Sequence, residues 1–142
     1  MSIVQQLREL GADHGGNSEP ARLARFFGEA EVKIGTFHES LNMAALWKLP
    51  VIYIVENNRF GMGTAIERSS AIYDVAQRAC AYDMASETVD GMDVLAVRDV
   101  IGRAVDLARR EHAPTLIEAR CYRFMGHSMS DPRKYRTREE EE

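Results

Sequence analysis

Two polar side chains in the first half of the sequence could together hold a hard metal ion. Glu29 follows the partly apolar segment 21–27, and Asn58 follows the apolar run 51–55. Mg²⁺ prefers oxygen ligands in proteins, and it commonly shares them with a diphosphate. The residues also allow a simpler interpretation, in which Glu29 is a solvated side chain at a strand end and residues 57–58 form an ordinary turn.

The backbone near these two residues contains glycines that suit a phosphate site. Gly28 ends the first apolar segment just before an expected helix. Free N–H groups at such a place favour negative charge. Glu29 and Glu31 oppose an anion there unless a cation lies between. In the second segment, ENNRFGMGT, two asparagines precede Gly61 and Gly63, and these residue types predict an unusual backbone path because they tolerate left-handed conformations.

A third group of functional side chains lies in YRFMGHSMSDPRKYRTR, near the C-terminal end. His127 lies between Gly126 and Ser128, Asp131 follows closely, and several basic residues surround them. A histidine on a loop can change charge near neutral pH, so His127 is a candidate for acid–base chemistry or phosphate contact. The alternative from the residues alone is an exposed loop histidine without a function.

These three segments lie between elements of an alternating α/β pattern. Apolar runs predict strands over residues 21–27, 51–55, 87–89 and 115–121. Apolar residues at helical spacing predict helices over residues 36–48, 73–82 and 94–108. Thr36 and Glu39 are spaced as a capping box, and Asp93 is the expected N-cap of the last helix. Residues 57–68 are expected to form a loop, and residues 122–142 a loop and tail.

The order of these elements predicts an α/β fold with a parallel sheet and crossover helices. In such sheets, ligands gather beyond the carboxyl ends of the strands. The segments that follow the first, second and last strands are therefore expected to meet at one edge of the sheet. That placement would bring Glu29, Asn58 and the His127 loop to a common site.

Composition narrows the possible classes of function. The 142 residues suit one domain, and 45% hydrophobic with 28% charged residues is an ordinary globular balance. The formal net charge of −4 argues against nucleic-acid binding by bulk charge. No apolar run approaches the length that spans a bilayer, which argues against a membrane protein. Cys80 and Cys121 lie far apart without a CxxC pattern, so reduced thiols in a cytoplasmic protein are expected.

Residues 26–64, 89–95 and 122–140 together resemble the alpha subunit of the decarboxylating component of pyruvate dehydrogenase. This family consists of thiamine-diphosphate-dependent 2-oxoacid dehydrogenases. The segments NMAALWKLP, ENNRFGMGT and GHSMSDP carry the resemblance most specifically, and GHSMSDP with YRTREE favours pyruvate over other substrates. On this basis residues 26–142 form a thiamine-diphosphate-binding alpha-type domain with a partial fold of that class, and residues 1–25 form a non-matching lead-in.

The resemblance implies an activity and partners. The expected activity is oxidative decarboxylation of pyruvate with acetyl transfer to a lipoyl group, using thiamine diphosphate and Mg²⁺. The expected partners are a beta subunit and a lipoyl-bearing acyltransferase component. The expected location is the bacterial cytoplasm or, as a second choice, the mitochondrial matrix.

The resemblance also assigns roles to individual residues. Mg²⁺ would be held by the Glu29 carboxylate, the Asn58 side chain and the backbone carbonyl of Phe60. His127 would contact the diphosphate and assist catalysis, and Ser128 matches a serine that is phosphorylated in mitochondrial relatives. The remaining residues expected at the cofactor are Gly28, Ala30, Glu31 and Gly61.

One segment departs from the family pattern, and the departure supports an alternative. The family motif begins Gly-Asp-Gly, whereas this sequence has Gly28-Glu29-Ala30. Glu29 is one methylene longer than aspartate, and Ala30 replaces a glycine where a positive φ or a close approach to phosphate is expected. Glu31 adds a second negative charge. The alternative function is therefore a truncated or degenerate, non-catalytic paralogue that keeps the fold and the subunit interface.

Overall fold

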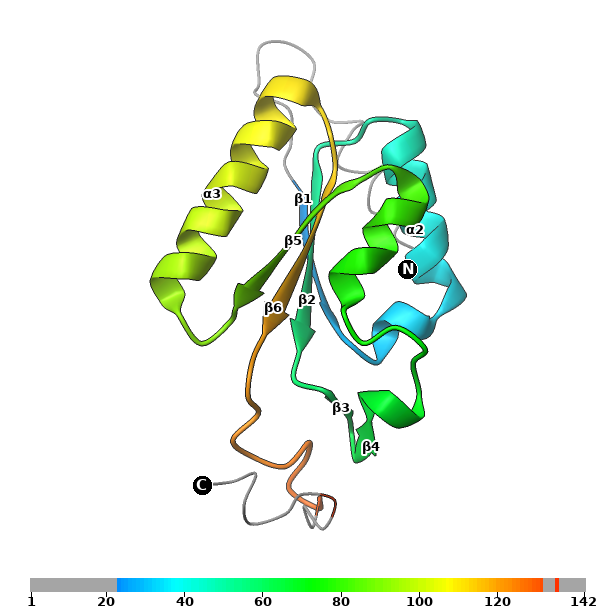
Figure 1. Ribbon diagram of the computed structural model, residues 1–142, viewed down its shortest axis with the longest axis vertical. Coiled ribbons are helices and arrows are strands. Elements are labelled where there is room, and N and C mark those ends of the chain that lie inside the picture. Colours follow the sequence, from blue (N-terminus) through cyan, green and yellow to red (C-terminus); the bar gives the residue numbers. More distant parts are fainter. Residues whose placement is uncertain (1–22, 132–134, 136–142) are drawn as a thin grey trace.

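Four parallel strands form the centre of the computed structural model, in the order β1-β2-β6-β5 (Figure 1). The structure describes residues 23–131 and residue 135. The strands of this sheet are β1 (Leu23–Gly28), β2 (Val51–Asn57), β5 (Ala85–Asp90) and β6 (Thr115–Arg120). The predicted lead-in lies almost entirely outside the described residues, as do the basic side chains at positions 133, 134, 136 and 138.

Helices cover both faces of this sheet. The α-helices are α2 (Gly35–Leu46) and α3 (Val94–Glu111), and the 3-10 helices are η1 (Glu31–Lys33), η2 (Ile66–Arg68) and η3 (Val75–Tyr82). A small antiparallel hairpin of β3 (Phe60–Gly61) and β4 (Thr64–Ala65) follows β2. Figure 1 shows α3 on one side of the sheet and α2 with η3 on the other, while the hairpin lies beyond the carboxyl end of β2.

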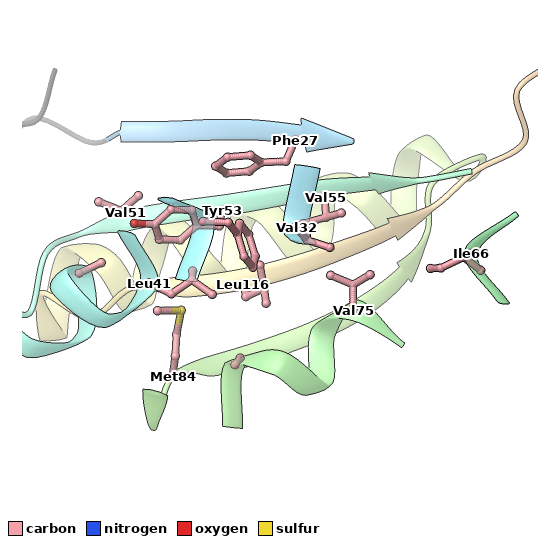
Figure 2. Close-up of a cluster of buried hydrophobic side chains, with 13 residues drawn as sticks. Phe27, Val32, Leu41, Val51, Tyr53, Val55, Ile66, Val75, Met84 and Leu116 are labelled. Carbon is pink, nitrogen blue, oxygen red and sulfur yellow. The ribbon is translucent and has the colours of Figure 1, made fainter. Parts of the chain in front are cut away.

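Two apolar clusters hold the layers together. The larger one packs side chains of β1, β2 and β6 against α2 and η3, with Tyr53 and Leu41 at its centre (Figure 2). The smaller one packs the opposite face of the sheet against α3, through Ile54, Ile117 and Val100 among others. β2 is buried on both faces, which explains its continuous apolar run. Each fully buried side chain of the size of valine, leucine or isoleucine contributes about 1.5–3 kcal/mol to folding.

β1 lies at the edge of this sheet, and its two faces differ. Phe27 is buried against Phe37 and Tyr53, whereas Phe26, on the opposite face, is 58% exposed. Arg25, which is unusual for a core strand, places its guanidinium 5.4 Å from the centre of the Phe27 ring. An edge strand tolerates this charged residue because one side of the strand stays near solvent.

Most of the predicted elements are confirmed, and two local predictions are wrong. Asp93 caps α3 as expected, because its side chain accepts hydrogen bonds from the backbone N–H groups of Leu95 and Ala96. The capping box at Thr36 is wrong: α2 begins one residue earlier, and its N-cap is Ile34, which has no side-chain hydrogen bond. The expected loop over residues 57–68 contains the β3–β4 hairpin and η2 instead.

No helix within the described residues is both long enough and apolar enough to cross a membrane.

Candidate metal and diphosphate site

Glu29 lies directly after β1 and is buried, with 2% of its surface exposed. Its Oε2 atom has no hydrogen-bond partner among the described residues. The interpretation of Glu29 as a solvated strand-end residue is therefore wrong. Burying a carboxylate without a partner is costly, so this position favours a nearby cation.

The backbone at Ala30 shows why glycine is not required there. Ala30 has φ −71° and ψ −31°, an ordinary helical conformation at the start of η1. The expectation of a positive φ at this position is thus wrong. Gly61 of β3 lies opposite, because a Cβ added to it would be 2.8 Å from the Ala30 Cβ and 3.9 Å from Glu29 Oε1. The hairpin therefore packs against the turn that carries Glu29, and glycine at position 61 makes room for the alanine.

The segment after β2 follows an unusual path, but its left-handed residues are not the asparagines and glycines on which the sequence prediction rested. Asn57 Oδ1 accepts a hydrogen bond from the backbone N–H of Arg59 at 3.0 Å, and Asn58 Oδ1 accepts one from Phe60 at 3.2 Å. Arg59 and Met62 both have positive φ values, of 65° and 57°. The turn interpretation of residues 57–58 is therefore confirmed. A turn does not exclude a ligand role, because an amide oxygen that accepts one hydrogen bond keeps a second lone pair.

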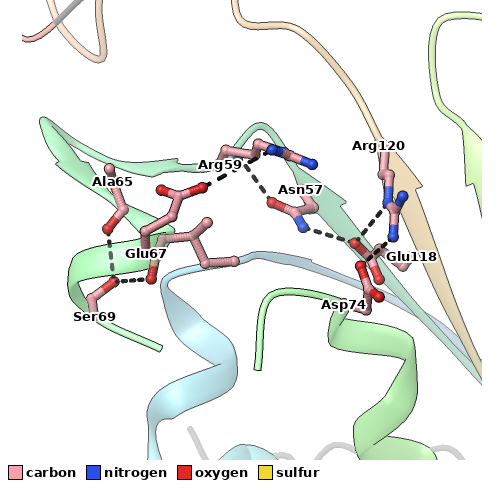
Figure 3. Close-up of polar contacts among 9 residues, drawn as sticks. Asn57, Arg59, Ala65, Glu67, Ser69, Asp74, Glu118 and Arg120 are labelled. Atoms are coloured by element: carbon pink, nitrogen blue, oxygen red, sulfur yellow. Dashed lines mark hydrogen bonds and ion pairs between the residues drawn. The ribbon is translucent and has the colours of Figure 1, made fainter. Parts of the chain in front are cut away.

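Sequence reasoning missed a buried carboxylate beside this turn. Glu118 of β6 is fully buried and accepts a hydrogen bond from Asn57 Nδ2 at 2.8 Å (Figure 3). It also accepts one from the Ala76 backbone N–H at 2.9 Å. Arg120 Nε lies 3.3 Å from the same carboxylate. The signal was a single glutamate among the buried apolar residues 116, 117 and 119 of β6.

Arg123 connects the hairpin to the segment after β6. Its guanidinium donates hydrogen bonds to the backbone carbonyls of Phe60 and Met62, at 3.3 and 2.7 Å. It also donates to the Tyr135 hydroxyl at 2.8 Å, and the Phe60 and Tyr135 rings lie 5.5 Å apart. The segments after β2 and β6 therefore meet at the carboxyl edge of the sheet, as the topology predicted.

His127 is exposed and lies on this second segment. Its backbone N–H donates to Asp131 Oδ2 at 2.7 Å, and the Tyr135 hydroxyl donates to the same oxygen at 2.6 Å. A hollow of about 510 Å³ opens here, at the tip of the β3–β4 hairpin. It is lined by Met62, Gly63, His127, Ser128, Ser130, Asp131 and Tyr135. The structure thus brings the His127 loop to the hairpin tip and Glu29 to the hairpin's β3 strand.

Two carboxylates act on Cys121, which lies at the carboxyl edge of the sheet. The pKa of the Cys121 thiol is raised, mainly by burial and further by the negative charges of Glu56 and Glu29. Cys80 and Cys121 are both free cysteines. Lys33 of η1 donates a hydrogen bond to the Ser69 hydroxyl at 2.5 Å.

The residues present fit a hard metal ion. The Glu29 carboxylate, the Asn58 amide oxygen and the Phe60 carbonyl are oxygen ligands of the kind that Mg²⁺ takes. The Phe60 carbonyl already accepts from Arg123 and keeps one lone pair for a metal. Within residues 23–131 and 135, no three or more His, Cys, Asp and Glu side chains form a group that could hold a metal ion. A metal site here would therefore rest on one carboxylate and two neutral oxygens, with the remaining positions left for water or phosphate.

Comparison with known proteins identifies the family. A sequence profile described as "Dehydrogenase E1 component" matches residues 17–142. The pyruvate dehydrogenase E1 component subunit alpha of Porphyra purpurea is 51% identical over 127 residues, which are 87% of this chain and 37% of that protein. The subunit alpha of an acetoin:2,6-dichlorophenolindophenol oxidoreductase from Bacillus subtilis is 46% identical over 115 residues, which are 81% of this chain and 34% of that protein.

A solved structure supports the fold independently. Transketolase from Campylobacter jejuni superimposes with a TM-score of 0.62 over 82% of this chain and 17% of its own, at 19% sequence identity. This likeness confirms the predicted α/β fold with its parallel sheet. The chain spans about a third of the length of the curated relatives that it matches. Because the family profile covers most of the sequence and includes all three of its motif segments, the resemblance is confirmed and the chain belongs to the dehydrogenase E1 component family.

Proposed function

We propose that this chain holds the metal and the diphosphate of thiamine diphosphate in the alpha subunit of a pyruvate dehydrogenase E1 component. The observation that carries the proposal is the buried Glu29 carboxylate, whose Oε2 has no partner among the described residues and which lies beside Gly61. Glu29, Asn58 and the Phe60 carbonyl would bind Mg²⁺. Bound thiamine diphosphate supplies the chemistry that removes carbon dioxide from a 2-oxoacid.

The flanking residues would bind and orient the diphosphate. A Cβ built at Gly28 meets no atom within 4 Å, so the backbone is open to close approach there. Ala30 and Gly61 form the adjacent wall, and the exposed Glu31 would be separated from phosphate by the cation. His127, held by its backbone N–H on Asp131, would reach the diphosphate and move a proton during catalysis.

The complete reaction would need other chains. The proposed activity is oxidative decarboxylation of pyruvate, with acetyl transfer to the lipoyl group of an acyltransferase component. A beta subunit would complete the site. Residues 26–142 would form the cofactor-binding part and residues 1–25 the lead-in, in a protein of the bacterial cytoplasm. Acetoin is a second candidate substrate, because a relative named for it is 46% identical to this chain.

The test is calorimetric titration of Mg²⁺ and thiamine diphosphate into the 142-residue chain co-expressed with a beta subunit. Binding that depends on both ligands, with release of carbon dioxide from pyruvate, is the expected result. Glu56→Gln is the matched control for Glu29→Gln, because Glu56 lies at the same sheet edge but is exposed. An assembly that forms without binding either ligand would instead favour the non-catalytic paralogue.

A further inference from the structure

Glu118 is a buried carboxylate to which the proposed function gives no role. It lies in β6 with 0% of its surface exposed, among the apolar residues of the strand. An ionised side chain at such a position is costly to bury unless hydrogen-bond donors surround it. The donors that surround Glu118 therefore identify what the carboxylate holds in place.

Three segments of the chain meet at this carboxylate. Oε1 accepts from Asn57 Nδ2 at 2.8 Å and from Arg120 Nε at 3.3 Å (Figure 3). Oε2 accepts from the Ala76 backbone N–H at 2.9 Å. Arg120 in turn reaches Asp74, the residue before η3, with Nη2 and Oδ1 2.5 Å apart. Glu118 thus joins the end of β2 to the start of η3.

The contact with Asn57 fixes the direction of its amide group. Because Nδ2 points to Glu118, Oδ1 faces the backbone N–H of Arg59, and this second bond supports the left-handed conformation of Arg59. A residue other than glycine pays a free-energy cost to adopt the left-handed conformation, and it keeps that conformation only where surrounding contacts hold it. The turn that follows carries the Asn58 amide oxygen and the Phe60 carbonyl.

We propose that Glu118 is a positioning residue that holds Asn57 and thereby sets the turn that presents Asn58 and Phe60 to the metal. The effect on the metal rests on the proposed function, whereas the hold of Glu118 on Asn57 and on the turn does not. Groups that orient metal ligands in this indirect way typically change metal affinity by about 10–100-fold when they are removed.

The first test is Glu118→Gln in the full 142-residue chain. An amide at this position cannot accept from both Asn57 and Ala76 on its two ends, because one end becomes a donor. We expect the Arg59 amide hydrogen to exchange with solvent at least about tenfold faster, and the affinity for Mn²⁺ with thiamine diphosphate to fall by a similar factor. Glu87→Gln is the control. Glu87 lies on β5, the strand next to β6, and the substitution removes its carboxylate from an exposed ion pair with Arg103 of α3.

A paired variant separates positioning from general stability. Asn57→Asp combined with Glu118→Gln reverses the polarity of the contact, so that the introduced amide donates to the introduced carboxylate. The free oxygen of that amide can still accept from Ala76, and the carboxylate can still accept from Arg59. We expect the doubly substituted chain to restore slow exchange of the Arg59 amide hydrogen, whatever the melting temperature of that variant.

The outcomes decide the proposal in each case. Unchanged exchange at Arg59 in folded Glu118→Gln overturns it. If the single variant does not fold, the paired variant decides: a protected Arg59 amide supports the proposal, and an unprotected one overturns it. If the unmodified chain, co-expressed with a beta subunit, binds no Mn²⁺ in the presence of thiamine diphosphate, the proposed function fails, while the exchange measurements still decide whether Glu118 holds the turn.

Discussion

The turn around Glu29 and the loop around His127 differ in a way that the motifs alone do not suggest. The Glu29 segment departs from its family pattern, yet Glu29 is buried and packed against Gly61. The His127 segment matches the pattern closely, yet residues 127–130 are exposed, and Met129 is completely so. Agreement with a motif and local constraint by the rest of the chain are therefore separate properties.

The two regions differ in the contacts that hold them. Glu29 and Glu118 are buried, Asn57 bonds to Glu118, and Gly61 packs on Ala30, so contacts within the chain organise this region of Glu29, Ala30, residues 57–61 and Glu118. In the His127 loop, Arg123 bonds to the β3–β4 hairpin ahead of His127, Asp131 accepts from the His127 backbone N–H, and exposed residues between them line a hollow. The described part of the chain therefore constrains this loop less than it constrains the Glu29 region.

The largest expected effect comes from removing the charge in the organised region. Glu29→Gln keeps the size of the side chain but takes away the single carboxylate of the proposed ligand set. We expect Mn²⁺ binding in the presence of thiamine diphosphate to weaken by about 100-fold or more. Thermal stability without metal should stay the same or rise, because a buried charge without a partner is lost. Titration followed by Mn²⁺ electron paramagnetic resonance measures the first, and a melting curve the second.

A variant that keeps full metal affinity would contradict this prediction and remove Glu29 from the ligand set. His127→Gln provides the comparison from the other region. It should weaken Mn²⁺ binding much less than Glu29→Gln does, because His127 would contact the diphosphate and not the metal.

The next effect concerns the packing between Ala30 and Gly61. Gly61→Ala places a methyl group 2.8 Å from the Ala30 Cβ, closer than carbon atoms can approach. Overpacking of this kind costs about 1–3 kcal/mol, which urea unfolding would measure. Ala30→Gly in the same chain should recover most of the loss, so the two substitutions should be strongly non-additive. Gly102→Ala on α3 is the control, because a Cβ there meets nothing within 4 Å. Additive effects would mean that the hairpin does not pack on the Glu29 turn.

A smaller effect is expected in the exposed loop. Asp131→Asn weakens the acceptor shared by the His127 backbone N–H and the Tyr135 hydroxyl. Hydrogen bonds to a charged group are worth about 1 kcal/mol more than neutral ones, so the His127 amide should exchange on the order of five times faster. Asp99→Asn, in an exposed pair with Arg98 on α3, is the control. Unchanged exchange would show that other contacts hold the loop.

The sheet could be predicted from the sequence because the spacing of apolar residues indicates each strand and helix. The continuous run of β2, the amphipathic α3 and its N-cap Asp93 all follow from local rules. The site was less predictable, since its features arise from contacts between distant segments. The burial of Glu29 depends on the β3–β4 hairpin, and the role of Glu118 depends on Asn57 and Ala76, which no local pattern connects.

The smallest predicted effect lies where the two regions join. Cys121 directly follows β6 and begins the segment that carries His127, and its backbone N–H donates to the Asn57 carbonyl. Burial is the main cause of its raised pKa, and the charge of Glu29 adds to it. Neutralising that charge by Glu29→Gln should lower the pKa of Cys121 and raise its thiolate fraction. The rate of alkylation by iodoacetamide near pH 8 should then increase on the order of twofold, as expected for a partly screened charge.

Cys80 is the internal reference, because it is exposed and lies on η3, away from this edge of the sheet. Its rate should not change in the same variant. If Glu29→Gln leaves the alkylation rate of Cys121 unchanged, the charge of Glu29 does not act on the Cys121 thiol, and the prediction is wrong.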